Sequence, residues 1–297
     1  MRNDDEQINN QLHYRNKHKN KYQFDELIKS EPSLSKFIIT NKYKIETINF
    51  SNPDAVKTLN KALLKHFYGL TYWEIPNGNL CPPIPSRAEY IHQIADLIEN
   101  KNGQKTTILD IGTGANLVYP IIGATEYNWH FIASDINKES IQNAEKITEN
   151  NQVLKNKIEI RFQNNPKKIF ENIINQTDKI DCTICNPPFH ASQEEANKST
   201  TRKNKNLNPN ITKPVLNFGG KNNELWCEGG EITFIQNMIN ESINYSNQVT
   251  WFTTLVSKET SLKPIYQTLK KVKATSIKTI PFTIGNKTTR IVAWKFN

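Results

Sequence analysis

The sequence contains little cysteine and no long apolar run, and both absences narrow the class of protein. Four cysteines in 297 residues are too few for a disulfide-stabilised scaffold, which favours a reducing cytoplasm. No hydrophobic stretch approaches the length of a membrane span, and the first ten residues, MRNDDEQINN, lack the apolar core of a secretion signal. We therefore expect a cytoplasmic protein, monomeric and without a membrane partner.

Acidic residues are missing from two long stretches of a chain whose net charge is +9. Residues 11–21 and 197–223 carry basic residues and no acid, and residues 257–297 carry a single acid, Glu259. These clusters predict a polyanionic partner, with solvated loops of a lysine-rich chain as the alternative. The candidate contacts with the polyanion are Arg15, Lys17, Lys19, Lys21, Arg202, Lys203 and Lys205.

From residue 106 onward, strand-like apolar runs alternate with helical patterns. This order predicts an α/β protein with a mostly parallel sheet and helices on both faces. The last two runs flank Gly285-Asn286, which predicts a hairpin and one antiparallel strand. The expected strands are 106–112, 130–136, 157–162, 179–185, 248–256, 275–284 and 289–296. The expected helices are 54–70, 82–100, one from about 116, 137–151, a short one from Pro166, 231–246 and 261–271.

The segment LDIGTGAN (109–116) follows a strand and opens a helix, as a cofactor-binding loop does. Gly112 and Gly114 permit a tight turn and a close approach of the backbone to a ligand. A dinucleotide site would have a third glycine where this chain has Leu117. The loop therefore favours a cofactor with adenosine and no phosphate, and S-adenosylmethionine (AdoMet) fits.

Polar side chains near this loop are candidate cofactor contacts. Asp135 ends the second strand, where it would accept hydrogen bonds from both ribose hydroxyls, and a helix N-cap is the alternative. Asp110 would lie under the loop and orient its backbone, with a capping or turn carboxylate as the alternative. Gln163 and Asn164 follow the third strand at the level of an adenine edge, where ordinary loop chemistry is the alternative.

The run IDCTICNPPFH (180–190) is a strand that stops at a rigid Asn-Pro-Pro-Phe. Asn186 Oδ1 and the Pro187 carbonyl can both accept hydrogen bonds from an exocyclic amine, which frees the nitrogen lone pair to attack a methyl group. Phe189 offers a stacking face to a planar substrate. These three residues are the candidate catalytic set, and the alternative is a strand end with a buried phenylalanine.

Cys182 and Cys185 form a C-x-x-C pair within the same run, a spacing that also occurs in zinc and redox sites. Because no second pair completes a four-ligand site and both residues lie in a strand, we expect buried core residues and no metal.

The motifs resemble those of the ribosomal RNA large-subunit methyltransferase F family, to which the eukaryotic methyltransferase-like protein 16 is related. The resemblance covers nearly the whole chain, in order. The matching segments are LHYRNKHKNKY, LNKALLKHFYG, LCPPIPSRAEYIH, LDIGTGAN, NPPFHAS, NFGGKNNELWCEGGE, SKETSLKPIY and GNKTTRIVAW.

The resemblance implies a Rossmann-like class I AdoMet-dependent methyltransferase whose seven strands, counted as above, have the order 3-2-1-4-5-7-6. It implies methylation of N6 of a specific adenine in 23S ribosomal RNA (rRNA), presented as RNA or as a large-subunit assembly intermediate. The implied AdoMet contacts are Arg87, Gly112, Asn116, Asp135 and Asn164, and the implied substrate contacts are Asn186, Pro187 and Phe189. The stretch WCEGGE (226–231) is expected beside the substrate, with helix capping as the alternative for Glu231.

Two domains and three competing activities follow from this interpretation. Residues 1–80 form a basic, mainly helical extension that contacts RNA, and residues 81–297 form the methyltransferase domain. A glutamine-amide methyltransferase of a translation factor uses a similar Asn-Pro-Pro-aromatic motif, and a DNA adenine methyltransferase is a further alternative. An RNA-binding assembly factor with weak catalysis is the alternative from another class.

Overall fold

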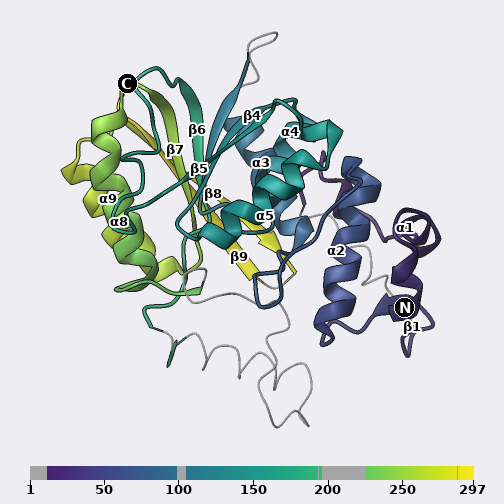
Figure 1. Cartoon of the computed structure of the whole chain (residues 1–297). Helices are drawn as coiled ribbons and strands as arrows, with labels where there is room; N and C mark the ends of the chain where they lie inside the picture. Colours follow the sequence, from purple (N-terminus) through teal and green to yellow (C-terminus); the bar gives the residue numbers. More distant parts are fainter. Residues whose placement is uncertain (1–11, 99–104, 193, 196–224, 286) are drawn as a thin grey trace.

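The computed structural model describes residues 12–98, 105–192, 194–195, 225–285 and 287–297. Within this part of the chain, seven strands form one sheet in the order β5-β4-β3-β6-β7-β9-β8 (Figure 1). This is the order 3-2-1-4-5-7-6 that the resemblance implies. The strands are β3 (Thr107–Ile111), β4 (His130–Asp135), β5 (Ile158–Phe162), β6 (Ile180–Cys185), β7 (Val249–Val256), β8 (Ser276–Ile284) and β9 (Lys287–Lys295).

The first five strands of the sheet are parallel, and the last two form the expected hairpin. β9 pairs antiparallel with both β7 and β8. β3 lies between β4 and β6, with Ile111 opposite both Ser134 and Cys185. The carboxyl ends of these three strands therefore lie side by side at one edge of the sheet, where open α/β sheets bind their ligands.

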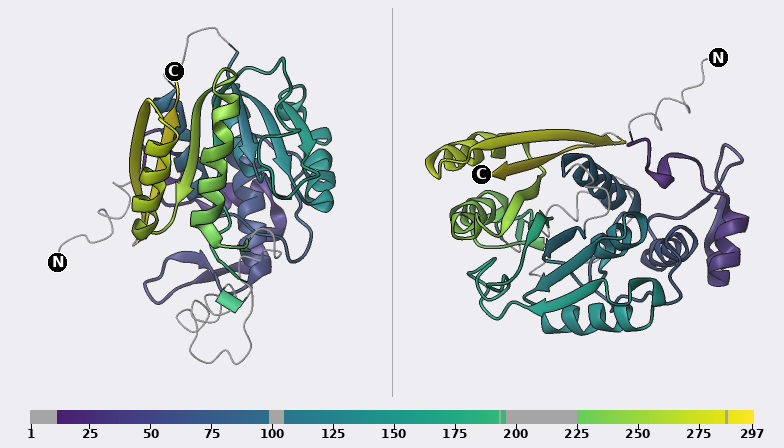
Figure 2. Two further views of the ribbon diagram at one scale, coloured as in Figure 1. Left: turned by 90° about the vertical axis from the view of Figure 1, so that its left-hand side faces the viewer. Right: turned by 90° about the horizontal axis from the view of Figure 1, so that it is seen from above.

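Two hydrophobic cores cover the two faces of the sheet. On one face the core includes Ile108, Phe131 and Ile184 together with the helices α3 (Ile84–Leu97), α4 (Val118–Glu126) and α5 (Lys138–Glu149). On the other face, Leu109 and Ile132 pack against α8 (Gly230–Ser242) and α9 (Leu262–Lys271). Figure 2 shows α8 and α9 lying across this second face.

The N-terminal elements extend the first core. Phe24 and Leu34 belong to the same buried cluster as residues of α3 and α4. Figure 1 shows α1 and α2 outside the α3–α5 layer, on the side away from α8 and α9. The elements are η2 (Lys17–Lys19), α1 (Phe24–Ser30), η3 (Pro32–Phe37), β1 (Ile38–Thr40), β2 (Glu46–Ile48) and α2 (Pro53–Tyr68), with Gly69 as the C-cap of α2.

The helix expected from Pro166 is wrong: the residues after Pro166 form turns and bends. Three consecutive backbone N–H groups, those of residues 169–171, donate to the carboxylate of Glu241 on α8 at 2.8–2.9 Å. Asn172 has φ +66°, which a right-handed helix excludes. Among the described helices, none is both long and apolar enough to cross a membrane.

Gly123 in α4 provides a test of how tightly the first core is packed. A Cβ at this position would meet the Phe131 ring, with Cε2 at 2.7 Å, and Trp129 Cε3 at 3.0 Å. Alanine is favoured over glycine in a helix by about 1 kcal/mol, but overpacking a core costs about 1–3 kcal/mol. We expect Gly123→Ala to lower the free energy of unfolding by up to about 2 kcal/mol in urea titrations. In the Phe131→Leu background, which removes the ring atoms concerned, the same substitution should cost less, and equal costs in both backgrounds would contradict this packing.

Candidate active site

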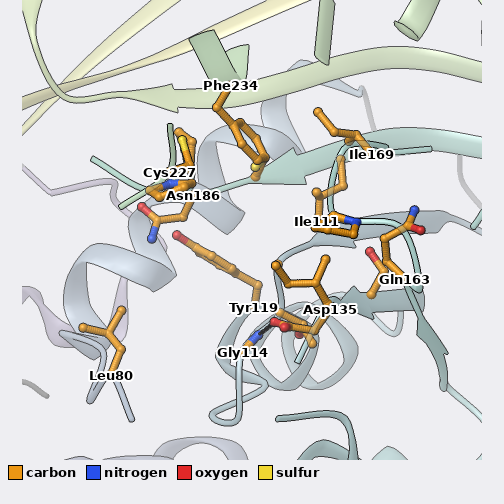
Figure 3. A pocket seen from close by; sticks show the side chains of 18 of the residues that line it. Leu80, Ile111, Gly114, Tyr119, Asp135, Gln163, Ile169, Asn186, Cys227 and Phe234 are labelled. Atoms are coloured by element: carbon orange, nitrogen blue, oxygen red, sulfur yellow. Dashed lines mark hydrogen bonds between the residues drawn. The ribbon is translucent and has the colours of Figure 1, made fainter. Parts of the chain in front are cut away.

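A cavity of about 340 Å³ opens at the carboxyl ends of β3, β4 and β6. Its walls include the loop after β3, the end of β4, the Asn-Pro-Pro segment after β6, and side chains from α3, α4 and α8. This volume lies within the range of small-molecule sites. Figure 3 shows Asn186 and Cys227 at one end of the cavity and Asp135 and Gln163 at the other.

The glycine loop after β3 is held in place by the end of β4. Gly112 and Gly114 have φ +73° and +66°, values that side-chain-bearing residues rarely adopt. The N–H groups of Gly112 and Thr113 both donate to the Ser134 carbonyl at 2.9 Å. The space where a Gly112 Cβ would lie is open, so the backbone itself forms that part of the cavity wall.

Asp135 lies between this loop and the next helix. Its Oδ2 accepts the Gly114 N–H at 2.8 Å and its Oδ1 accepts the Asn137 N–H at 2.8 Å. Asn137, not Asp135, is the N-cap of α5, because its side chain accepts the Ser140 N–H. Burial raises the pKa of the Asp135 carboxyl, and the two backbone N–H donors act in the opposite direction. A carboxylate has further lone pairs for hydroxyl donors in the cavity.

Ser134 and Asp135 hold the backbone of the glycine loop, and the orienting role expected of Asp110 stays a prediction. The Asp110 side chain is 1% exposed, and neither carboxyl oxygen makes a hydrogen bond to the residues described by the structure. Burial raises the pKa of this carboxyl to about 7, which the nearby Arg87 guanidinium opposes. Asp110 is therefore a buried acid beside the cavity with unused hydrogen-bonding capacity.

Arg87, Tyr119 and Asn186 meet although they lie far apart in the chain. Arg87 extends from α3, is 8% exposed, and donates from Nη1 to the Tyr119 hydroxyl at 2.9 Å and to Asn186 Oδ1 at 3.4 Å. Its guanidinium also lies 5.4 Å from the centroid of the Tyr119 ring. The sequence motifs contained no signal for Tyr119, which reaches this cluster through the packing of α4 against α3.

The amide residues near the cavity have different surroundings. Asn116 lines the cavity, but its side chain is also structural: Oδ1 accepts the Val118 N–H at 3.1 Å, and Nδ2 donates to the Leu80 carbonyl at 3.4 Å. Gln163 is buried and lines the cavity. Asn164 is exposed and lies outside the set of residues that line it.

The WCEGGE stretch borders the first cavity, and its expected place beside the substrate stays a prediction. Trp226, Cys227 and Glu228 all line it. Glu231 does not cap α8; its carboxylate accepts the Ser257 N–H at 2.7 Å and the Ser261 hydroxyl at 2.8 Å. This carboxylate is 3% exposed and connects the start of α8 to the segment after β7.

A second cavity, of about 230 Å³, adjoins the first. Arg87 and Asn186 line both cavities. Phe189 lines the second cavity and not the first. The hairpin β8–β9 contributes Lys287, whose Nζ lies 5.7 Å from the centroid of the Phe189 ring. The remaining lining residues are Pro83, Ser86, Leu255, Ser257, Ile284 and Thr289.

Two of the predicted polyanion contacts near the N-terminus have acidic partners that the local sequence does not reveal. Arg15 pairs with Asp96 of α3, and Lys17 Nζ lies 2.6 Å from Glu126 Oε1 of α4. Lys19 donates to the Tyr14 carbonyl at 2.8 Å. Lys21 is exposed. The predicted contacts Arg202, Lys203 and Lys205 lie outside the described residues.

Cys182 and Cys185 are core residues, as predicted. Both are free and buried in β6. Cys182 packs in the core on the α3–α5 face and Cys185 in the core on the α8–α9 face. Because the two thiols point to opposite faces of the sheet, this pair does not form a joint ligand set.

Comparisons with known proteins point to RNA methylation. The profile of a family described as RNA methyltransferase matches residues 6–297. The Ribosomal RNA large subunit methyltransferase F of Flavobacterium johnsoniae is 57% identical over 294 residues, covering 96% of this chain and 93% of that protein.

Two solved structures share the fold along nearly the whole chain. The human Mettl16 catalytic domain in complex with MAT2A 3′UTR hairpin 6 has 29% identity and a TM-score of 0.81, covering 97% of this chain and 98% of that one. The N-terminal domain of human METTL16 in complex with SAH has 26% identity and a TM-score of 0.77, covering 96% and 99%.

The buried Asp110 predicts an unusual pH dependence of stability. An aspartate in an unfolded chain ionises near pH 3.9, whereas Asp110 in the folded protein ionises at about 7. Between these values the unfolded chain binds fewer protons, so stability falls as the pH rises, by about 1.4 kcal/mol per unit. We expect wild-type protein to lose about 3 kcal/mol relative to Asp110→Asn between pH 4 and pH 7.

Urea unfolding of both proteins without cofactor, at unit intervals of pH, measures this difference. Asp25→Asn, which removes an exposed carboxyl from α1, is the matched control. A gap between wild type and Asp110→Asn that stays constant with pH would contradict the raised pKa of Asp110.

Proposed function

The chain belongs to this RNA methyltransferase family, has the class I methyltransferase fold and uses AdoMet as its cofactor, and from that premise we propose that it methylates N6 of one specific adenine in 23S rRNA. The observation that supports this proposal most directly is the meeting of two cavities at Asn186 and Arg87. One cavity suits the methyl donor and the other suits the base that accepts the methyl group.

The first cavity fits AdoMet by the chemistry of its donors. Asp135 offers carboxylate lone pairs for ribose hydroxyls, and Gln163 offers an amide at the far end for an adenine edge. Asp110 and the Thr113 hydroxyl are buried with side-chain oxygens that have no hydrogen-bond partner in the described structure. Arg87 supplies a cation for a carboxylate at the end nearest Asn186. When bound, AdoMet supplies an electrophilic methyl group.

The second cavity is proposed as the site of the acceptor adenine. Asn186 Oδ1 and the Pro187 carbonyl accept hydrogen bonds from the exocyclic amine, and Pro187 and Pro188 restrict the backbone that carries them. Phe189 stacks on the base, which must leave its own stack to enter. The amine loses its proton after it becomes cationic, so the site needs no strong base.

The remaining parts of the proposal concern the surroundings of this site. The N-terminal extension, residues 1–80, holds phosphates of the RNA next to the methyltransferase domain, residues 81–297. Its basic residues Arg15, Lys17, Lys19 and Lys21, together with Arg202, Lys203 and Lys205, make these contacts, so binding weakens steeply with salt. The protein works in the cytoplasm as a monomer, on 23S rRNA or on a large-subunit assembly intermediate.

The test is to incubate the protein with methyl-labelled AdoMet and 23S rRNA from cells that lack this gene, and to identify the labelled nucleoside after digestion. Label in N6-methyladenosine supports the proposal. Precursor particles of the large subunit serve as a second substrate beside naked RNA. Label that enters only a translation factor or only DNA would overturn the proposal in favour of the corresponding alternative.

Asn186→Ala removes one of the two proposed acceptors and should lower kcat at least about 100-fold, because methyl transfer depends on the position of the amine. AdoMet binding, measured by calorimetry, should change little. Asn186→Asp keeps a side-chain oxygen acceptor and is the matched control, expected to retain more activity than the alanine variant. Equal activity of wild type and Asn186→Ala would exclude this role.

Phe189→Leu removes the aromatic face while keeping apolar volume, and it should raise KM for RNA about tenfold, since stacking contributes about 1–3 kcal/mol per base. Phe189→Tyr keeps the ring and should behave like wild type. Steady-state kinetics with varied RNA concentration measure the effect. An unchanged KM in Phe189→Leu would show that the base does not stack on this ring.

A further inference from the structure

Glu89 of α3 is a buried carboxyl residue that accepts hydrogen bonds from two residues of the N-terminal segment. Its side chain is 1% exposed. Oε2 accepts the backbone N–H of His13 at 2.8 Å and the Asn16 Nδ2 at 3.0 Å, and Oε1 accepts the Gln93 Nε2 at 3.0 Å. The two catalytic cavities are lined by other residues, so Glu89 has a role that the proposed chemistry does not use.

Asn16 completes this connection from the other side. It is fully buried, and its Nδ2 donates to the Pro85 carbonyl at 3.1 Å as well as to Glu89. Its Oδ1 accepts the His18 N–H at 3.1 Å, which caps η2. Residues 13–19, which we call the basic segment, are therefore bound to the first half of α3 by buried hydrogen bonds.

The same helix carries Arg87 toward the active site. Residues two positions apart in an α-helix project about 200° apart around its axis. Arg87 contacts Tyr119 and Asn186, while Glu89 contacts the basic segment on the opposite side. The rigid helix α3 thus connects the basic segment, through Glu89, to the proposed acceptor site, through Arg87.

The ion pairs of the basic segment are less suited to fix its position. Arg15 (30% exposed) pairs with Asp96 (51% exposed), which also meets the His13 imidazole, and Lys17 (44% exposed) pairs with Glu126 (14% exposed), so each pair is partly open to solvent. Exposed ion pairs contribute little and are screened by salt. RNA phosphates would compete for the same two cations, whereas the hydrogen bonds of Glu89 use a backbone N–H and an amide that RNA does not displace.

We propose that Glu89 is a positioning residue that fixes the basic segment to α3, so that Arg15, Lys17 and Lys19 meet the RNA at a set distance from Asn186. This inference rests on the proposed RNA substrate. It predicts that loss of the Glu89 acceptor weakens RNA binding although a negative charge has been removed. A purely electrostatic account predicts the opposite sign, because removal of an acid near RNA strengthens binding.

The experiment compares five proteins at full length: wild type, Glu89→Leu, Glu89→Gln, Asp96→Asn and Asn16→Ala. Glu89→Leu removes the acceptors. Glu89→Gln keeps one oxygen that can accept hydrogen bonds from both His13 and Asn16, while its NH₂ group turns toward the Gln93 side chain. Asp96→Asn removes a carboxylate that contacts the Arg15 and His13 side chains of the same segment and leaves the bonds to Glu89 in place, so it is the matched control for charge. Asn16→Ala tests the connection without a change in α3.

The first readout is hydrogen exchange of peptides that cover residues 12–19, measured without RNA. We expect at least about tenfold faster exchange in Glu89→Leu and Asn16→Ala, and wild-type exchange in Glu89→Gln and Asp96→Asn. Exchange of α4 and β3 and the affinity for AdoMet should stay unchanged. Wild-type exchange of the segment in both disruptive variants, or a parallel loss of AdoMet affinity, would overturn the inference.

The second readout is binding and methylation of 23S rRNA over a range of salt. Glu89→Leu should raise KM for RNA about tenfold with kcat nearly unchanged. The slope of the logarithm of its RNA-binding constant against the logarithm of the salt concentration should be smaller in magnitude by about 2, since three phosphate contacts contribute about 0.7 each. Asp96→Asn should bind RNA as tightly as wild type or more tightly. Tighter binding by Glu89→Leu would overturn the inference, and failure of wild type to act on RNA would overturn the proposed function instead.

Discussion

The parallel pairing of β3 between β4 and β6 is the constraint on which the site depends. It sets Ile111 opposite Ser134 on one side and Cys185 on the other, so three strands end together. Gly112 after β3, Asp135 at the end of β4 and Asn186 after β6 then share one cavity. A shift of one residue in this register would turn every side chain of a strand to the opposite face. The residues of that strand would then leave the core into which they pack.

The backbone around the cavity is fixed more firmly than the polar side chains in it. The Ser134 carbonyl and the Asp135 carboxylate hold three successive N–H groups of the glycine loop. Asp110, in contrast, is buried without a hydrogen-bond partner among the described residues. Burying such a group costs free energy in the absence of a ligand. The fold therefore carries a cost at the proposed cofactor site, as functional sites often do.

The N-terminal extension is joined to the catalytic part by a common core and by polar contacts of two kinds. Phe24 and Leu34 pack into the core that also contains α3 and α4. Above it, exposed ion pairs neutralise part of the positive charge of the basic segment, and buried hydrogen bonds to Glu89 hold its backbone. Exposed pairs are screened by salt and contribute little, whereas buried hydrogen bonds to a charged group fix geometry, so the two kinds of contact differ in how firmly they hold the segment.

The sequence by itself determined the parts of this protein that depend on local chemistry. Gly112, Asp135 and Asn186 were identified because backbone freedom, strand ends and proline stiffness are encoded by adjacent residues, and the alternation of strands and helices followed from periodicity. The order of the strands came from the family resemblance. Tertiary structure decided what depends on distant partners: Tyr119 beside Arg87, Glu231 on Ser257, and Glu89 on His13. It also replaced the helix expected at Pro166 by turns, because the Glu241 carboxylate binds the N–H groups there. These contacts join residues 26 to 76 positions apart, which leave no local pattern, and only the folded chain brings them together.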